Sequence, residues 1–178
     1  MKKIVLTFGL IGGAIMSGMF LITYPFHDAI GFDRSLIIGY TSIVLAFLLI
    51  FFGVRSYRDN VGGGRVSFGR ALGVGTLIAL VASLCYVAMW EVAYFSFAHD
   101  YMDKYQAHEI EKARAQGDSE EAIARQQAEM EKFEAMYQNP VINAALTLAE
   151  PLPVGLIVAL VSAGVLSRRK HERVGQVA

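Results

Sequence analysis

The sequence predicts an all-α fold: a four-helix transmembrane bundle with an extracytoplasmic helical hairpin between the third and fourth helices. Two observations support this prediction. Hydrophobic residues make up 54% of the chain and charged residues only 18%, whereas a soluble domain usually carries about 25% charged residues. The charges also occur in blocks, and the long charge-poor stretches between the blocks are typical of a membrane protein.

Four apolar stretches are long enough to cross a hydrocarbon core of roughly 30 Å, which takes ~20 helical residues. They cover residues 4–24, 36–54, 71–98 and 141–167 of a single membrane domain formed by residues 1–178. Each stretch must be helical, because unpaired backbone groups are costly in lipid. The first stretch follows two lysines, as in a signal peptide, but it is long and no convincing cleavage site follows it. We therefore expect it to be retained as a helix.

Lysine and arginine residues near the ends of the spans predict the orientation of the chain. If there are four spans, one side of the membrane receives ten basic residues: Lys2, Lys3, Arg55, Arg58, Arg65, Arg70, Arg168, Arg169, Lys170 and Arg173. The other side receives Arg34 and the predominantly acidic segment 99–139. The positive-inside rule thus predicts a multi-pass protein of the bacterial inner (plasma) membrane, with its N-terminus and C-terminus in the cytoplasm.

Small residues recur at every fourth position of three predicted spans. The three series are Gly9, Gly13 and Ser17; Ala71, Gly75, Ala79 and Ser83; and Gly155, Ala159 and Ala163. Such series let helix backbones approach closely, either within one bundle or between two copies of the chain. The expected partners are therefore the lipid bilayer and a second copy or another membrane protein. The net charge is zero and no general basic surface is present, so no nucleic acid is expected.

Residues 99–139 are predicted to form the hairpin. Gln116-Gly117-Asp118-Ser119 is typical of a turn, and the third span is expected to continue outward as one helix to about Ala115. Asp118 is the predicted N-cap of the second arm, with Glu121 completing a capping-box-like pair. Asn139-Pro140 should end that arm and begin the next helix. The hairpin has little apolar area, so we expect it to lean on the bundle or on a partner.

Two carboxylates lie inside the predicted spans. Glu91 and Glu150 are both expected roughly 25–30 Å from the cytoplasmic ends of their helices, at 1.5 Å per residue, so they should share one plane near the outer interface. Trp90 fits an interfacial aromatic belt at that level. Ionisable groups inside spans are costly and often functional. Three interpretations remain open: hydrogen bonds between helices, a proton or cation site, and a pocket for a lipid or other small molecule.

Glu150 begins the segment Glu150-Pro151-Leu152-Pro153-Val154-Gly155. Pro151 and Pro153 remove two backbone donors and disturb the helix. A carboxylate beside a broken helix resembles the ion sites of transporters, although an ordinary kink or a helix that starts at Pro151 fits equally well. The candidate binding residues are Glu91, Glu150, Pro151, Pro153, Trp90 and Asp100.

A metal site is a weaker hypothesis. Glu91, His99 and Asp103 lie on one stripe of a continuous helix, and His99 with Asp103 has the spacing at which two side chains can hold one metal ion. A glutamate and His27 from the first outer loop would complete a site for a divalent cation. The alternative is that His99 and Asp103 are simply solvated. No other cofactor is expected.

The sequence lacks the common catalytic motifs. It has no Ser-His-Asp arrangement, no HExxH and no CxxC, and Gly62-Gly63-Gly64-Arg65 lacks the Lys-Ser/Thr of a P-loop, so a turn is expected there. The leading function class is a non-enzymatic membrane protein that binds a partner or ligand through its outer face. The alternative is a small oligomeric transporter or a cation- or proton-binding protein that uses Glu91 and Glu150. A membrane enzyme has the least support.

Distinctive short segments follow one another along the chain. Gly63-Gly64-Arg65-Val66-Ser67-Phe68-Gly69-Arg70-Ala71 precedes the third span, Trp90-Glu91 lies near its outer end, and Asn139-Pro140 and Glu150-Pro151-Leu152-Pro153-Val154-Gly155 lead into the fourth. In these segments the chain resembles the DUF4199 family of small bacterial membrane proteins, whose function is uncharacterised. The resemblance covers nearly the whole chain and implies that Glu91 and residues 150–155 matter. It implies no particular activity.

Overall fold

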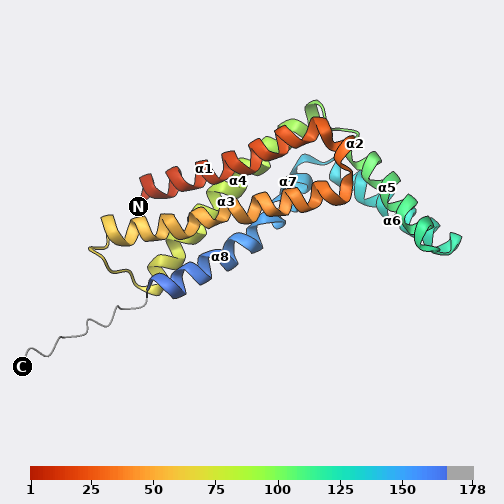
Figure 1. The fold of residues 1–178 in the computed structure, drawn as a ribbon. Helices are drawn as coiled ribbons and strands as arrows, with labels where there is room; N and C mark the ends of the chain where they lie inside the picture. The colour runs from red at the N-terminus through yellow and green to blue at the C-terminus, as the bar shows by residue number, and fades with distance from the viewer. Residues whose placement is uncertain (168–178) are drawn as a thin grey trace, which may run out of the picture.

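The structure is a computed structural model, and it describes residues 1–167, with the side chain of Asp28 left out. This part of the chain is helical and contains no strand. Its helices, shown in Figure 1, are α1 (Lys2–Thr23), the 3-10 turn η1 (Tyr24–Phe26), α2 (His27–Ile30), α3 (Phe32–Asn60), α4 (Phe68–Ser96), α5 (Tyr101–Gln116), α6 (Glu120–Tyr137), α7 (Pro140–Ala149) and α8 (Pro151–Leu166). The predicted basic residues Arg168, Arg169, Lys170 and Arg173 lie outside the described residues.

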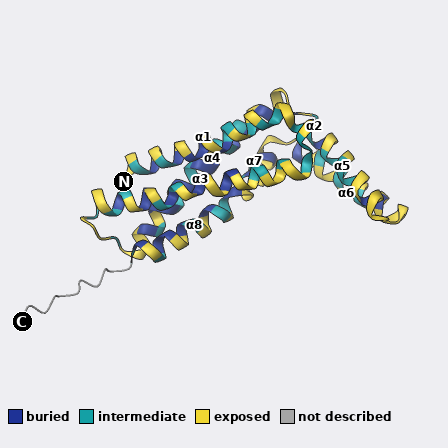
Figure 2. Cartoon of the chain, in the orientation of Figure 1, coloured by how far each residue is buried: buried dark blue, intermediate teal, exposed yellow. Residues whose placement is uncertain are grey.

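Four helical segments are long and apolar enough to cross a membrane. They are Lys2–Phe26, Phe32–Asn60, Phe68–Ser96 and Pro140–Leu166. Only 22% to 39% of the most apolar part of each segment is buried, and exposed positions recur along the helices (Figure 2). Many of the exposed side chains are large and apolar. A soluble monomer rarely exposes so much contiguous apolar surface, whereas lipid would cover it. The prediction of an all-helical, multi-pass membrane protein is therefore confirmed.

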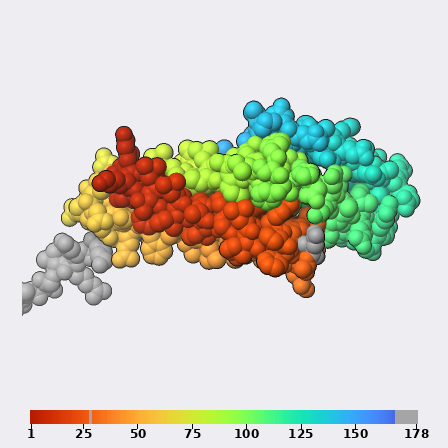
Figure 3. Space-filling view, turned by 90° about the horizontal axis from the view of Figure 1, so that it is seen from above, coloured from red at the N-terminus to blue at the C-terminus, as the bar shows by residue number. Residues whose placement is uncertain are grey.

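The bundle has two ends with different contents. We call the half toward Lys2, Asn60, Phe68 and Leu166 the terminal half, and the half toward α5 and α6 the hairpin half. The hairpin formed by α5 and α6 projects from one end of the bundle, and α1 lies along α4 (Figures 1 and 3).

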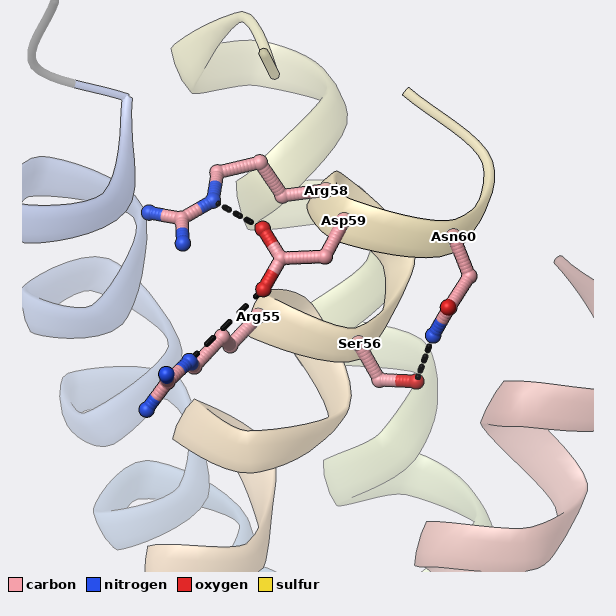
Figure 4. Close-up of polar contacts among 5 residues, drawn as sticks. All are labelled: Arg55, Ser56, Arg58, Asp59 and Asn60. Carbon is pink, nitrogen blue, oxygen red and sulfur yellow. Dashed lines mark hydrogen bonds and ion pairs between the residues drawn. The ribbon is translucent and has the colours of Figure 1, made fainter. Parts of the chain in front are cut away.

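The terminal end carries half of the lysine and arginine residues that the structure describes. Arg58 and Arg55 both pair with Asp59 at the end of α3, at 2.7 Å and 3.7 Å, and Asn60 donates a hydrogen bond to Ser56 (Figure 4). These contacts are exposed, so they contribute little to stability. The glycine-rich connection between α3 and α4 forms a turn, as its sequence predicts.

Small residues hold the terminal half together. A Cβ added to Gly75 of α4 would lie 2.9 Å from the Cβ of Ala159, and one added to Gly155 of α8 would lie 2.8 Å from that of Ala79. Between α1 and α4, a Cβ at Gly13 would lie 2.5 Å from that of Cys85. These separations leave no room for a larger residue. The predicted small-residue series on α1, α4 and α8 therefore pack within the chain.

The third span does not continue as one helix to Ala115, as the sequence suggested. Helix α4 ends at Ser96, and α5 begins at Tyr101 after a short break. The amides of Phe97 and Ala98 both donate to the carbonyl of Ala93, which closes the helix. The hydroxyl of Tyr24 then donates to the carbonyl of Phe97 at 3.2 Å, and the two rings are in contact. A partner from the end of α1 thus stabilises the break.

The turns of the hairpin are close to those predicted, with one correction. Gly117 ends α5 with φ of 84°, a left-handed conformation that favours glycine. Ser119, and not Asp118, is the N-cap of α6, because the Ser119 hydroxyl accepts a hydrogen bond from the amide of Ala122. Asn139 caps α7 in the same way, and Pro140 is its first residue, as expected.

The base of α5 packs on the start of α3. The Phe32 ring contacts Tyr101, Tyr105 and His108, and it stacks on His108 at 5.2 Å between ring centroids. Lys112 forms an ion pair with Asp33 at 3.2 Å. Contacts with α3 of the bundle therefore fix the position of this arm of the hairpin.

Candidate functional site

The hairpin half contains a cavity of about 130 Å³. Side chains from α1, α3 and α4 form its walls, and residues of α2, α5, α6 and α7 also line it. The lining residues are Met16, Met19, Phe20, Thr23, Tyr24, His27, Ser35, Leu36, Ile38, Gly39, Tyr40, Ser42, Ile43, Tyr86, Trp90, Tyr101, Tyr137, Thr147 and Glu150. Concave sites with mostly apolar walls and a few polar groups are the usual form of a small-molecule site.

Aromatic rings make up much of the cavity wall. Trp90, Tyr94, Met102 and Tyr137 form a buried cluster, and Phe20 and Tyr101 pack against it. Trp90 meets the Phe20 ring at 5.1 Å and the Tyr101 ring at 5.3 Å between centroids, in both cases edge to face. Such pairs contribute about 0.5–1.5 kcal/mol beyond their buried area. The rings therefore form a well-supported wall.

A buried hydrogen-bond network fixes the position of Trp90. Its indole N–H points to the hydroxyl of Tyr137 at 2.9 Å and to the side-chain oxygen of Asn143 at 3.0 Å. The Asn143 amide donates to the carbonyl of Tyr137, and the hydroxyl of Thr147 donates to the Asn143 oxygen. Asn143 is fully buried. The network joins α4, the end of α6 and α7 at one side of the cavity.

Sequence reasoning predicted Trp90 but missed its partners. The sequence did not single out Tyr137, Asn143 or Thr147. A signal for the last two was available, because they lie four residues apart, on one face of an apolar span. Polar side chains in lipid tend to find partners on neighbouring helices.

Among the described side chains, Glu150 is the only carboxylate of the cavity lining. Tyr40 hydrogen bonds with this carboxylate, and Tyr86, Tyr101 and Tyr137 lie close enough to interact with its charge. No lysine or arginine is among the described residues that line the cavity. Burial raises the pKa of Tyr101 to about 12, with a smaller effect from Glu150, and burial also raises the pKa of Tyr137. Both phenols are therefore neutral near pH 7.

Glu150 lies at the junction of α7 and α8, beside the two predicted prolines. Its backbone is helical, with φ of −75° and ψ of −61°. Pro151 and Pro153 lie in the first turn of α8. They interrupt the hydrogen-bond ladder without unwinding the chain. Neither proline is among the residues of the cavity lining, so their contribution is to shape the helix next to Glu150.

Glu91 does not join Glu150 in the cavity lining. It is half-buried on α4, and within the described chain its Oε1 atom is buried without a hydrogen-bond partner. Tyr137 lies within electrostatic reach of both carboxylates. Of the predicted residues, Glu150 and Trp90 border the cavity, whereas Glu91 is not part of its lining.

The residues of the metal hypothesis are also not assembled. Among the residues that the structure describes, no group of three or more His, Cys, Asp or Glu side chains is placed to hold a metal ion. The break after Ser96 takes His99 and Asp103 out of line with Glu91, and Asp103 interacts with Glu134 on α6. Asp100 pairs with Lys104 at 3.0 Å, and this hydrogen bond lowers the pKa of Asp100. His27 lines the cavity.

Four apolar helices and an aromatic cavity define a multi-pass helical membrane protein with a small-molecule-sized site. The chain belongs to the DUF4199 family, described as a protein of unknown function, and the family model matches residues 7–168. This match confirms the resemblance found in the sequence. No similar protein was found among curated proteins, and none among solved structures.

Proposed function

We propose that the chain is a non-enzymatic inner-membrane protein that binds a small molecule in the cavity of its hairpin half. The observation that supports this most is the convergence of seven aromatic side chains and one carboxylate on a single cavity. The hydrogen-bond network around Trp90 holds one wall in place before any ligand binds, and such preorganisation favours affinity.

We place the hairpin half, and thus the cavity, on the extracytoplasmic side. Lys2, Lys3, Arg55, Arg58, Arg65 and Arg70 belong to the terminal end of the bundle. The positive-inside rule favours that end in the cytoplasm. The ligand would then enter from the outer leaflet or from the external solution.

Filling the cavity tests the proposal. Gly39 lines the cavity, and a Cβ added to it has no atom within 4 Å, so Gly39→Leu should occupy space without a clash. Gly73 on α4 is a matched control, because it is equally open but lies outside the lining. Native mass spectrometry of protein extracted from membranes should detect a bound small molecule or lipid in the wild type. The same ligand should be present at much lower occupancy in Gly39→Leu. Gly73→Leu should retain it. Equal occupancy in all three proteins would refute the proposal.

A second candidate function is cation or proton binding by Glu91 and Glu150. The observation in its favour is the buried, unpartnered Oε1 of Glu91 in the described chain. A buried carboxylate oxygen without a donor has room for a ligand that supplies positive charge. Proteoliposomes that contain the full chain should then show an ion or proton flux that Glu91→Gln abolishes. A flux equal to that of empty liposomes would exclude this function.

A further inference from the structure

We infer that the cavity recognises an organic cation: a compact ammonium group, primary or quaternary, held against Glu150 by the surrounding aromatic rings. This inference rests on the proposed function, because it names the chemical class of the ligand for the same site. Three properties of the cavity support it: its charge, its aromatic lining and its size.

The charge of the described lining is negative. Glu150 is its only carboxylate, and neither lysine nor arginine balances it. Tyr40 offers one hydrogen bond to this carboxylate, and His27 is the one imidazole of the described lining. Glu150 is an exposed residue at the edge of the cavity, and a ligand that carries the opposite charge gains more beside its carboxylate than a neutral one. Anionic ligands would be repelled.

The aromatic lining suits a cation whose charge is spread over methyl or methylene groups. Tyr40, Tyr86, Trp90 and Tyr101 come from three different helices and all border the cavity that contains Glu150. Cations are attracted to the faces of aromatic rings, and cages of such rings are the usual recognition site for quaternary ammonium groups. The tyrosine hydroxyls add hydrogen-bond acceptors for a primary ammonium group.

The size of the cavity limits the ligand to one compact group. Its volume of about 130 Å³ is close to that of a cavity of about 150 Å³ that holds benzene. A trimethylammonium or ethanolammonium group therefore fits, and a whole lipid does not. Leu36 and Tyr40 border the cavity but are 40% and 48% exposed on α3, so the cavity reaches the outer surface of the bundle. Two sources of the ammonium group are consistent with this opening: a free amine, or the headgroup of a lipid whose chains lie outside.

Trp90 provides the readout. It is the only tryptophan of the chain, and it lines the cavity, so its fluorescence reports directly on occupancy. The full chain would be placed in nanodiscs of phosphatidylglycerol, which has no ammonium group. Choline and its neutral isostere 3,3-dimethylbutan-1-ol would then be titrated. We expect a saturable change in Trp90 emission with choline, and at least about tenfold weaker binding of the isostere.

Variants assign the selectivity to Glu150. Glu150→Gln should weaken choline binding at least about tenfold and leave the isostere unchanged. Glu129→Gln, which removes an exposed carboxylate of α6 outside the lining, should bind choline like the wild type. If Glu150→Gln does not fold, the affinities of the wild type for choline and for its isostere still show whether the cavity selects a cation.

The outcomes separate the two proposals. Equal affinity for choline and the isostere, both lost in Gly39→Leu, would overturn the cation inference and leave the ligand-binding function standing. No change in Trp90 emission with either probe would overturn the cation inference, and equal occupancy in the mass spectrometry test would independently refute the function. If phosphatidylethanolamine in the nanodisc competes with choline, the ammonium source is a lipid headgroup. If it does not compete, the source is a free amine.

Discussion

In the terminal half of the bundle the helices meet through glycine and alanine, whereas in the hairpin half they meet through aromatic rings. Gly75, Ala79, Gly155 and Ala159 bring α4 and α8 within Cβ contact. Phe20, Trp90 and Tyr101 instead meet at ring distances above 5 Å, and a cavity lies beside them. Small residues allow backbones to approach closely, but large rings keep them apart. One half of the bundle is therefore built for close packing and the other for enclosing a space.

The largest effect should come from enlarging a small residue in the terminal half. Gly75→Leu places a side chain against Ala159 and Ile50, where even a Cβ is too close. We expect a loss of about 3 kcal/mol in the free energy of unfolding, because overpacking forces the backbones apart. Gly39→Leu, in the hairpin half, should leave stability nearly unchanged. Unfolding by SDS in mixed micelles measures both variants. Equal destabilisation of the two would remove the contrast between the halves.

A smaller effect is expected from breaking the network behind Trp90. Asn143→Ala deprives the indole N–H of one acceptor and removes the bonds of Asn143 to Tyr137 and Thr147. We expect a loss of about 1–2 kcal/mol, together with a shift of the Trp90 emission maximum to longer wavelength as the ring becomes mobile. The matched control is Ser83→Ala, because the described chain offers the buried Ser83 hydroxyl no hydrogen-bond partner. A loss in the control as large as that of Asn143→Ala would show that the network adds nothing specific.

The smallest effect concerns the pH dependence of the hairpin. Burial, helped by the nearby Asp103, raises the pKa of Glu134 above its ordinary value of 4.5. Because the folded-state pKa is raised, the stabilising contribution of protonated Glu134 is present below 4.5 and is lost as the pH rises through the raised value. The contact between α5 and α6 should therefore tighten on mild acidification.

Förster transfer between dyes on cysteines that replace Glu111 and Gln127 measures this contact, with Cys85 replaced by alanine. Transfer should increase slightly as the pH falls from 7 toward 4.5. Glu134→Gln stays neutral and should abolish the change, whereas Glu129→Gln should keep it. A pH response that persists in Glu134→Gln would assign the effect to another group.

The sequence was sufficient for features that depend on local composition. The four spans follow from hydropathy, and the Asn139-Pro140 start of α7 follows from capping preferences. It was insufficient where distant residues meet. The break after Ser96 depends on Tyr24, whose hydroxyl reaches the carbonyl of Phe97 across 73 positions of the chain. A helical period cannot reveal such a partner.

The candidate site was predictable only in part, because local composition reveals unusual residues but not which of them meet. Glu150 and Trp90 stood out as a carboxylate and an indole within spans, and both border the cavity. Glu91 satisfied the same criteria, but it lies outside the lining, because depth along a helix does not specify the direction of a side chain. The enclosing residues come from seven α-helices, the turn η1 and the junction of α7 with α8, and only the fold brings them together.

The cavity is tested by a crystal structure of the full chain, grown in a lipidic phase from material isolated from its native membrane. We expect non-protein density in the hairpin half, bounded by Tyr40, Trp90 and Glu150. A structure in which the side chains of Tyr40 or Tyr86 fill that space, with no room for a ligand, would contradict it.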